Sequence, residues 1–241
     1  MRLTLILSFF HSFTISTLKK PVWACLSMEK RFSTAARAYL LLLAIVGWFA
    51  LIGQFYLIII SKQASVGEII IRYFTFFTIL TNILIAVAST AILFAPRSGW
   101  GKFFSKVTTL TAITVNIVIV GATYNAILRY IWNPQGLQRV VDELLHLIIP
   151  ILFVLFWLIF VPKGRLKWGN IWLWTLYPLA YLAVILIRGA LSGYYPYPFV
   201  DVTKLGYPQA LLNCLGIAVA FIILSIIFIG IDKLMRRRSA R

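Results

Sequence analysis

Six runs of apolar residues, separated by short polar segments, dominate the chain. They lie near residues 38–60, 69–95, 107–131, 144–161, 171–190 and 209–231. A bilayer core about 30 Å thick needs about 20 apolar residues in helical form, and each run is about that long. The segments between the runs are too short to form a separate domain. The pattern therefore predicts an all-α polytopic membrane protein, a bundle of six transmembrane helices within one domain over 38–231.

Composition and charge support this prediction and give it an orientation. Hydrophobic residues make up 61% of the chain and charged residues 12%, which no soluble domain of this size could bury. Of the 23 basic residues, 17 lie in 1–37, 96–106, 162–170 and 232–241, beside only two acids, Glu29 and Asp232. Because cytoplasmic loops collect Lys and Arg, we expect both termini inside, with 1–37 a cytoplasmic lead and 232–241 a basic tail. The net charge of +17 is then explained by topology, and no nucleic-acid partner is expected.

The first 27 residues have an ambiguous pattern. A moderately apolar stretch from Leu3 to Leu18 is interrupted by polar residues and followed by Lys19-Lys20-Pro21. A signal peptide fits in part, and so does a lipoprotein-like segment ending at Cys25. We prefer an extension upstream of a natural start at Met28. Besides Cys25 the chain has only Cys214, so the sequence indicates neither a disulfide framework nor a metal site.

Polar residues at membrane depth are the best guide to function, since the chain has no nucleotide-binding loop, no zinc-protease motif and no sign of a cofactor. Unpaired polar groups in hydrocarbon are costly. In the second run Thr75, Thr78 and Asn82 lie at i, i+3 and i+7 and would share one helical face. That face should point into the bundle. Alternatively, these residues only join helices by hydrogen bonds.

His146 is the only histidine of the predicted bundle, and it follows Asp142 and Glu143 by about one helical turn. Either carboxylate could orient and stabilise the ring. Pro150 deprives the His146 carbonyl of its normal i+4 donor, so we expect a local bend. An interfacial histidine with a water partner is the simpler alternative.

Further polar residues are expected near the same membrane face. By position in their runs, Tyr124 and Arg188 lie close to outer exits and Tyr197 lies in the following aromatic, Pro-rich loop, while Asn116 lies deeper in the third run. A cluster in one leaflet argues against an ion path through the membrane. It favours a pocket that receives a lipid from the outer leaflet.

Three segments carry a resemblance to a known family. Arg72-Tyr73-Phe74-Thr75-Phe76, Glu143-Leu144-Leu145-His146 followed by Pro150, and Tyr197-Pro198-Phe199 resemble, in the same order, segments of the androgen-induced-gene membrane proteins and their bacterial six-span relatives. The likeness covers most of residues 37–235. It implies location in a bacterial inner membrane.

The resemblance also implies an intramembrane threonine hydrolase acting on fatty-acyl esters, a membrane lipid being its substrate. Carried over by motif, Thr75 is the nucleophile and His146 the base, with Thr78 the alternate nucleophile because the segment has three threonines. A hydroxyl needs such a base near neutral pH, and the acyl oxyanion needs a donor, for which Asn116, Tyr124, Arg188 and Tyr197 are candidates. Asn82 would support the nucleophile. A transporter and a non-enzymatic scaffold are the alternatives.

Overall fold

The structure is a computed structural model that describes residues 32–239, with side chains described to residue 236. The expectations for residues 1–27, including the start at Met28, lie outside the described residues. Within residues 32–239 every regular element is a helix. Six helical segments are long and apolar enough to cross a bilayer: Thr34–Ile60, Phe77–Phe94, Val107–Tyr130, Gly136–Phe160, Asn170–Ser192 and Val202–Arg236. The predicted six-span helical membrane bundle is thus confirmed.

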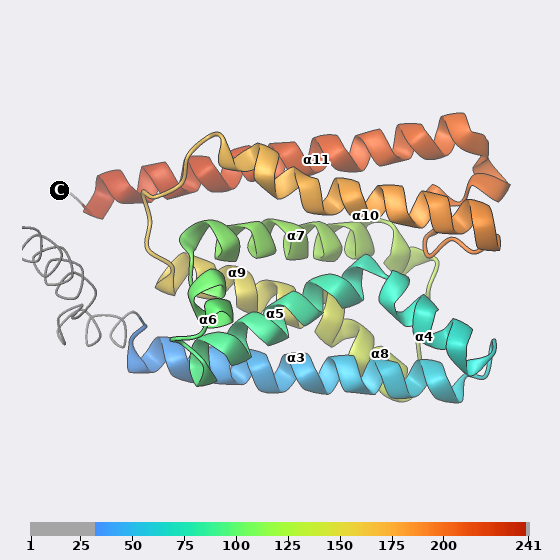
Figure 1. Cartoon of the computed structure of the whole chain (residues 1–241), viewed down its shortest axis with the longest axis horizontal. Coiled ribbons are helices and arrows are strands. Elements are labelled where there is room, and N and C mark those ends of the chain that lie inside the picture. The colour runs from blue at the N-terminus through green and yellow to red at the C-terminus, as the bar shows by residue number, and fades with distance from the viewer. Residues whose placement is uncertain (1–31, 240–241) are drawn as a thin grey trace, which may run out of the picture.

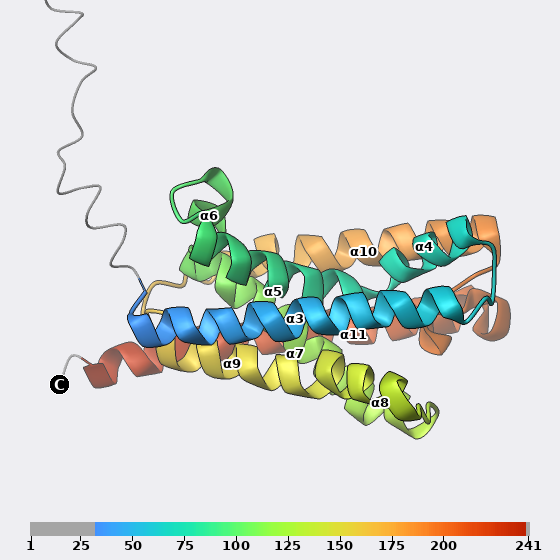
Figure 2. The same cartoon turned by 90° about the horizontal axis from the view of Figure 1, so that it is seen from below.

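The helices lie side by side along one long axis (Figure 1). The transmembrane elements are α3 (Thr34–Ile60), α5 (Phe77–Phe94), α7 (Val107–Ala126), α9 (Ile149–Phe160), α10 (Asn170–Ser192) and α11 (Val202–Ser239). Shorter elements join them: α4 (Val66–Thr75), α6 (Gly99–Phe104), α8 (Gly136–Glu143), the π-helical turn η2 (Leu144–Ile148), and the 3₁₀ turns η1 (Leu128–Tyr130) and η3 (Pro198–Val200). Both ends of the described chain lie at one end of the bundle, here called the terminal end (Figures 1 and 2). The opposite, distal end carries the connections 61–65, 127–135 and 193–201.

Helices α5 and α7 form the interior of the bundle. In the most apolar stretch of each of these two spans, 61% and 56% of residues are buried, against 22–33% in the other four spans. The exposed surfaces of those four spans are largely apolar. Close packing of α3 on α5 depends on Gly47, where an added Cβ would lie 3.3 Å from the Cβ of Ala86. On α9, Phe153, Phe156 and Trp157 are fully buried and fill the centre.

The second span differs from its prediction as one helix over 69–95. The helix is interrupted at Phe76, whose backbone is extended (φ −78°, ψ 124°). Helix α4 therefore ends at Thr75, and α5 alone forms the span. Two tyrosine hydroxyls from distant segments occupy this break. Tyr181 on α10 donates to the Thr75 carbonyl (2.8 Å) and accepts from the Phe77 N–H (3.2 Å), and Tyr197 accepts from the Thr78 N–H (3.5 Å). These bonds replace the helical hydrogen bonds that the break removes.

The connection 161–169 at the terminal end is tied to α11 by a buried carboxylate. Asp232 is fully buried and accepts from the backbone N–H groups of Gly164 (2.8 Å) and Leu166 (3.1 Å). Lys163 in the same connection donates to the carbonyls of Trp157 and Val161 at the end of α9 (both 2.5 Å). Burial lowers the pKa of Lys163 to about 8.

Candidate functional site

His146 lies in η2, between α8 and α9, where the helix changes its hydrogen-bonding pattern. Pro150 has no N–H to offer the His146 carbonyl, and the π-helical turn over Leu144–Ile148 is the local result. The freed carbonyl accepts instead from the Asn125 amide of α7 at 3.4 Å. Gly121 allows this approach, because a Cβ there would lie 3.2 Å from the same oxygen. The expected distortion at Pro150 is therefore present, as a π turn.

The imidazole is held from the side of Asp142. Its Nδ1 lies 2.9 Å from the Asp142 backbone carbonyl and 3.4 Å from the carboxylate Oδ1 of the same residue. A carbonyl oxygen can only accept, so Nδ1 carries the proton and Nε2 has a free lone pair. Asp142 is in turn fixed by the Tyr124 O–H, which donates to its Oδ2, while the Tyr124 ring stacks on His146 at 4.0 Å between centroids. Ring orientation and tautomer are thus both fixed by neighbouring groups.

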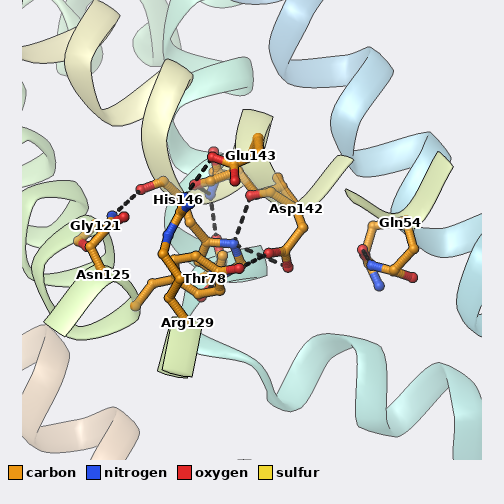
Figure 3. Close-up of polar contacts among 12 residues, drawn as sticks. Gln54, Thr78, Gly121, Asn125, Arg129, Asp142, Glu143 and His146 are labelled. Carbon is orange, nitrogen blue, oxygen red and sulfur yellow. Dashed lines mark hydrogen bonds and ion pairs between the residues drawn. The ribbon is translucent and has the colours of Figure 1, made fainter. Parts of the chain in front are cut away.

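A second ion pair closes this cluster toward the distal end. Arg129 bonds Glu143 at 2.6 Å, and its guanidinium lies over the Tyr124 ring at 5.3 Å. Figure 3 shows this ion pair beside the contacts that His146 makes with Asp142 and Thr78. The charge of Glu143 is therefore balanced by Arg129, and Asp142 is the carboxylate that faces the imidazole.

Thr78 is the threonine that meets His146. Its Oγ1 lies 3.3 Å from His146 Nε2, the nitrogen with the free lone pair. Asn82, one turn further along α5, is fully buried and donates to the carbonyls of Thr78 (2.8 Å) and Leu145 (3.2 Å). Asn82 therefore joins the start of α5 to η2, beside the Thr78–His146 contact.

Thr75 is not brought to the histidine. Its hydroxyl donates to the Ile71 carbonyl of its own helix at 2.7 Å, a normal bond for a helical threonine. The resemblance implied Thr75 as the nucleophile, and the shared face of Thr75 and Thr78 assumed one continuous helix. The break at Phe76 ends that face at Thr75, so the alternate residue Thr78 takes the position beside His146.

Two cavities meet at Thr78 and His146. One, of about 330 Å³, lies toward the distal end and is lined by side chains from α3, α5, α7, α8 and the connections, among them Gln54, Tyr124, Trp132 and Gln138. The other, about 50 Å³ in its narrow interior, lies between α5, α7, α10 and α11 and is mainly lined by apolar groups such as Ile119, Val120, Leu182, Ile185, Ile217 and Phe221. Thr78, Leu128, His146 and Tyr197 line both. We call them the distal cavity and the apolar cavity.

Tyr197 belongs to this junction and Arg188 does not. The Tyr197 phenol accepts from the Thr78 N–H, and burial raises its pKa, so it keeps its proton at neutral pH. Arg188 instead pairs with Glu68 at 2.7 Å, which also binds Arg72 at 2.8 Å. The hydrogen bond from Arg72, together with Arg188, holds the Glu68 pKa below its ordinary value. This ion pair ties Arg188 to α4, so the structure does not bring Arg188 to the Thr78–His146 contact.

Asn116 is also separate from the histidine. Its amide donates to the Ala112 carbonyl at 2.8 Å, and its side chain lines a third cavity of about 400 Å³ near Lys106, Trp174 and Tyr177. The side chain lies about two turns from Thr123, the α7 residue that lines the apolar cavity. Asn116 therefore does not support Thr78.

Several residues of the site were not found from the sequence. Tyr181 stands in no motif, yet its hydroxyl bonds the backbone on both sides of the helix break before Thr78. The positions of Gln54, Asn125 and Gln138 in the site could not be predicted, because each is a single amide outside any recognisable motif. In the part of the chain that the structure describes, no group of three or more His, Cys, Asp and Glu side chains is placed to hold a metal ion.

Comparison with protein-family models, with curated proteins and with solved structures finds no match to this chain. The class that fold and site define is therefore a six-span helical membrane protein with a threonine–histidine contact between two internal cavities.

Proposed function

We propose that the protein is an intramembrane hydrolase of fatty-acyl esters, with Thr78 as nucleophile and His146 as general base. The observation that carries the proposal is the 3.3 Å contact between Thr78 Oγ1 and the free lone pair of His146 Nε2, at the junction of the apolar cavity and the distal cavity. A hydroxyl becomes a competent nucleophile only beside such a base. In this proposal only the first carbons of the acyl chain lie in the narrow apolar cavity, the rest of the chain extends into the surrounding lipid, and the alcohol lies in the distal cavity.

The reaction follows from the positions of these groups. Thr78 Oγ1 attacks the acyl carbonyl while His146 Nε2 takes its proton, and Asp142 stabilises the resulting imidazolium. The tetrahedral intermediate collapses, and the alcohol leaves with the proton from His146. Water, deprotonated by His146, then attacks the Thr78 ester and releases the fatty acid, which restores the hydroxyl.

Tyr197 is the best candidate to donate to the oxyanion. The other three candidates are engaged elsewhere. The Tyr124 O–H donates a hydrogen bond to Asp142, Arg188 pairs with Glu68, and Asn116 lines another cavity. Tyr197 is a protonated phenol beside Thr78 at the start of α5. A fixed donor at the position where charge develops typically contributes about 10²–10³ in kcat.

The orientation we propose places the distal end outside the cell, in the outer leaflet of a bacterial inner membrane. At the terminal end lie the basic connections 95–106 and 161–169, which positive-inside topology assigns to the cytoplasm. A reporter fused after Arg241 should be cytoplasmic. A periplasmic reporter would reverse the orientation.

A transporter remains the second candidate, because the third cavity lies toward the terminal end and contacts Tyr177, one turn from Tyr181 of the apolar cavity. The Phe77 ring packs against both tyrosines, with centroids 5.5 and 4.9 Å away, and closes the space between the two cavities. An open polar path would favour transport, and this packing argues against such a path.

The test is hydrolysis of neutral fatty-acyl esters by the purified protein in detergent. Thr78→Ala should reduce kcat by about 10³-fold or more, and the Thr78→Ala/His146→Ala double variant should be hardly worse, because paired catalytic groups are not additive. Thr78→Ser should keep part of the activity. Thr75→Ala is the matched control, since its hydroxyl bonds its own helix, and it should stay within about threefold of wild type. Equal losses at Thr75 and Thr78, or no loss at either, would contradict the proposal.

A further inference from the structure

The distal cavity contains a pair of amides that the reaction does not use. Gln138 on α8 donates from Nε2 to Oε1 of Gln54 on α3 at 2.8 Å, and both side chains line the cavity that reaches Thr78 and His146. Both residues are half-buried. In Figure 3 Gln54 lies beyond Asp142 on the side away from Asn125. The pair therefore stands at a distance from the reacting groups, inside the same cavity.

The amide pair still has hydrogen-bonding groups to offer. One bond between two amides uses one oxygen and one N–H, so a carbonyl on one side chain and N–H groups on both are left over. This holds whichever way each terminal amide is assigned. A hydroxyl group is both donor and acceptor, and it could bond the free carbonyl and a free N–H together.

The charge of the distal cavity also limits what it can hold. Among the described residues that line it, Asp142 is the only charged side chain, and no Lys or Arg is present. Arg129 lies nearby but is bonded to Glu143. A carboxylate entering this cavity would meet a negative charge without a compensating cation, at a large cost in desolvation.

We propose that this site selects esters whose alcohol part is uncharged and carries hydroxyl groups, and that Gln54 and Gln138 bind those hydroxyls. This inference rests on the proposed hydrolase function and specifies its substrate class. The acyl chain leaves Thr78 by way of the apolar cavity, the ester carbonyl lies at Thr78, and a glycerol-like alcohol reaches the two amides.

Three esters with the same oleoyl chain test the inference: 1-monooleoylglycerol, ethyl oleate and O-oleoyl lactate. The wild-type kcat/KM should be highest for the glycerol ester and lowest for the lactate ester, whose alcohol carries a carboxylate. Gln54→Leu and Gln138→Leu should each lower kcat/KM for monooleoylglycerol about tenfold, mainly through KM, because each removes a neutral hydrogen bond. Ethyl oleate, which lacks the hydroxyls, should change less than about twofold.

Two further variants complete the experiment. Gln138→Lys adds a cation to the cavity and should raise kcat/KM for oleoyl lactate about tenfold or more. Gln135→Leu is the matched control, because Gln135 bonds Asn133 at 3.0 Å and does not line the cavity. It should leave all three esters unchanged.

The outcomes separate this inference from the function on which it rests. If wild type hydrolyses oleoyl lactate as well as monooleoylglycerol, or if the glutamine variants slow all three esters equally, the inference is wrong while the hydrolase stands. If none of the three esters is hydrolysed, or if Thr78→Ala hydrolyses them as well as wild type does, both are overturned.

Discussion

Replacing Asp142 by Asn removes a negative charge beside His146 while keeping the size and an oxygen of the side chain. In the wild type Oδ1 lies 3.4 Å from His146 Nδ1, and Oδ2 accepts from Tyr124. The tautomer is also held by the Asp142 backbone carbonyl at 2.9 Å, which the substitution leaves in place. Asp142→Asn should therefore remove the stabilisation of the imidazolium without turning the ring.

The size of the effect follows from the distance. Coulomb's law for unit charges at 3.4 Å gives about 5 kcal/mol at an effective dielectric constant of about 20, and about 1 kcal/mol at that of bulk water. The distal cavity of about 330 Å³ has room for several waters, so the effective value lies between these limits. We expect a loss of about 3 kcal/mol in transition-state stabilisation, or about 10²-fold in kcat.

The assay is steady-state hydrolysis of a neutral ester, with kcat and KM determined separately. KM should stay within about twofold, because the charge acts on the imidazolium that forms only in the transition state. Tyr124→Phe, which removes the donor to Oδ2 and keeps the carboxylate, should cost only about tenfold. If Asp142→Asn kept wild-type kcat, or changed KM alone, the assignment of Asp142 as the charge partner of His146 would be refuted.

Two further predictions concern the surroundings of the site. Glu68→Gln should lower the melting temperature by only a few degrees, because an ion pair this exposed contributes about 1 kcal/mol or less. Since Arg72 and Arg188 hold the Glu68 pKa below its ordinary value of 4.5, its stabilisation is complete above that pH and is lost as the pH falls through the lowered pKa. Between about pH 7 and pH 3 the melting temperature should fall more steeply in the wild type than in Glu68→Gln. The same dependence of melting temperature on pH in both proteins would contradict this prediction. Pro150→Ala restores an N–H for the His146 carbonyl and should stabilise a regular α-helix there. That change should turn the His146 ring away from Thr78 and lower kcat about tenfold or more. Full activity together with a higher melting temperature would show that the π turn is dispensable.

The spans could be predicted from the sequence because length and apolarity alone decide what crosses a bilayer. The pairing of His146 with Asp142 was also within reach, since the two residues are one helical turn apart. Both predictions depend on local spacing, which the sequence contains directly.

The break at Phe76 could not be predicted in the same way. Arg72-Tyr73-Phe74-Thr75-Phe76-Phe77-Thr78 contains neither Gly nor Pro, and the groups that satisfy the break come from Tyr181 and Tyr197, more than 100 residues away. Because the break was not foreseen, Thr75 and Thr78 were expected to lie on the same face of one continuous helix. The ion pair of Arg188 could not be predicted for a related reason. Its expected depth in the membrane gave no information about a partner on another helix, such as Glu68.

Labelling with a fluorophosphonate probe, followed by peptide mapping by mass spectrometry, tests the central claim most directly, because the probe forms a covalent adduct with an activated hydroxyl. The account predicts one adduct on Thr78 in the wild-type protein and none in His146→Ala, since without its base the hydroxyl is a weak nucleophile. Thr75→Ala should label as wild type does. An adduct on Thr75, or no adduct on either threonine in a protein that hydrolyses acyl esters, would contradict Thr78 as the nucleophile.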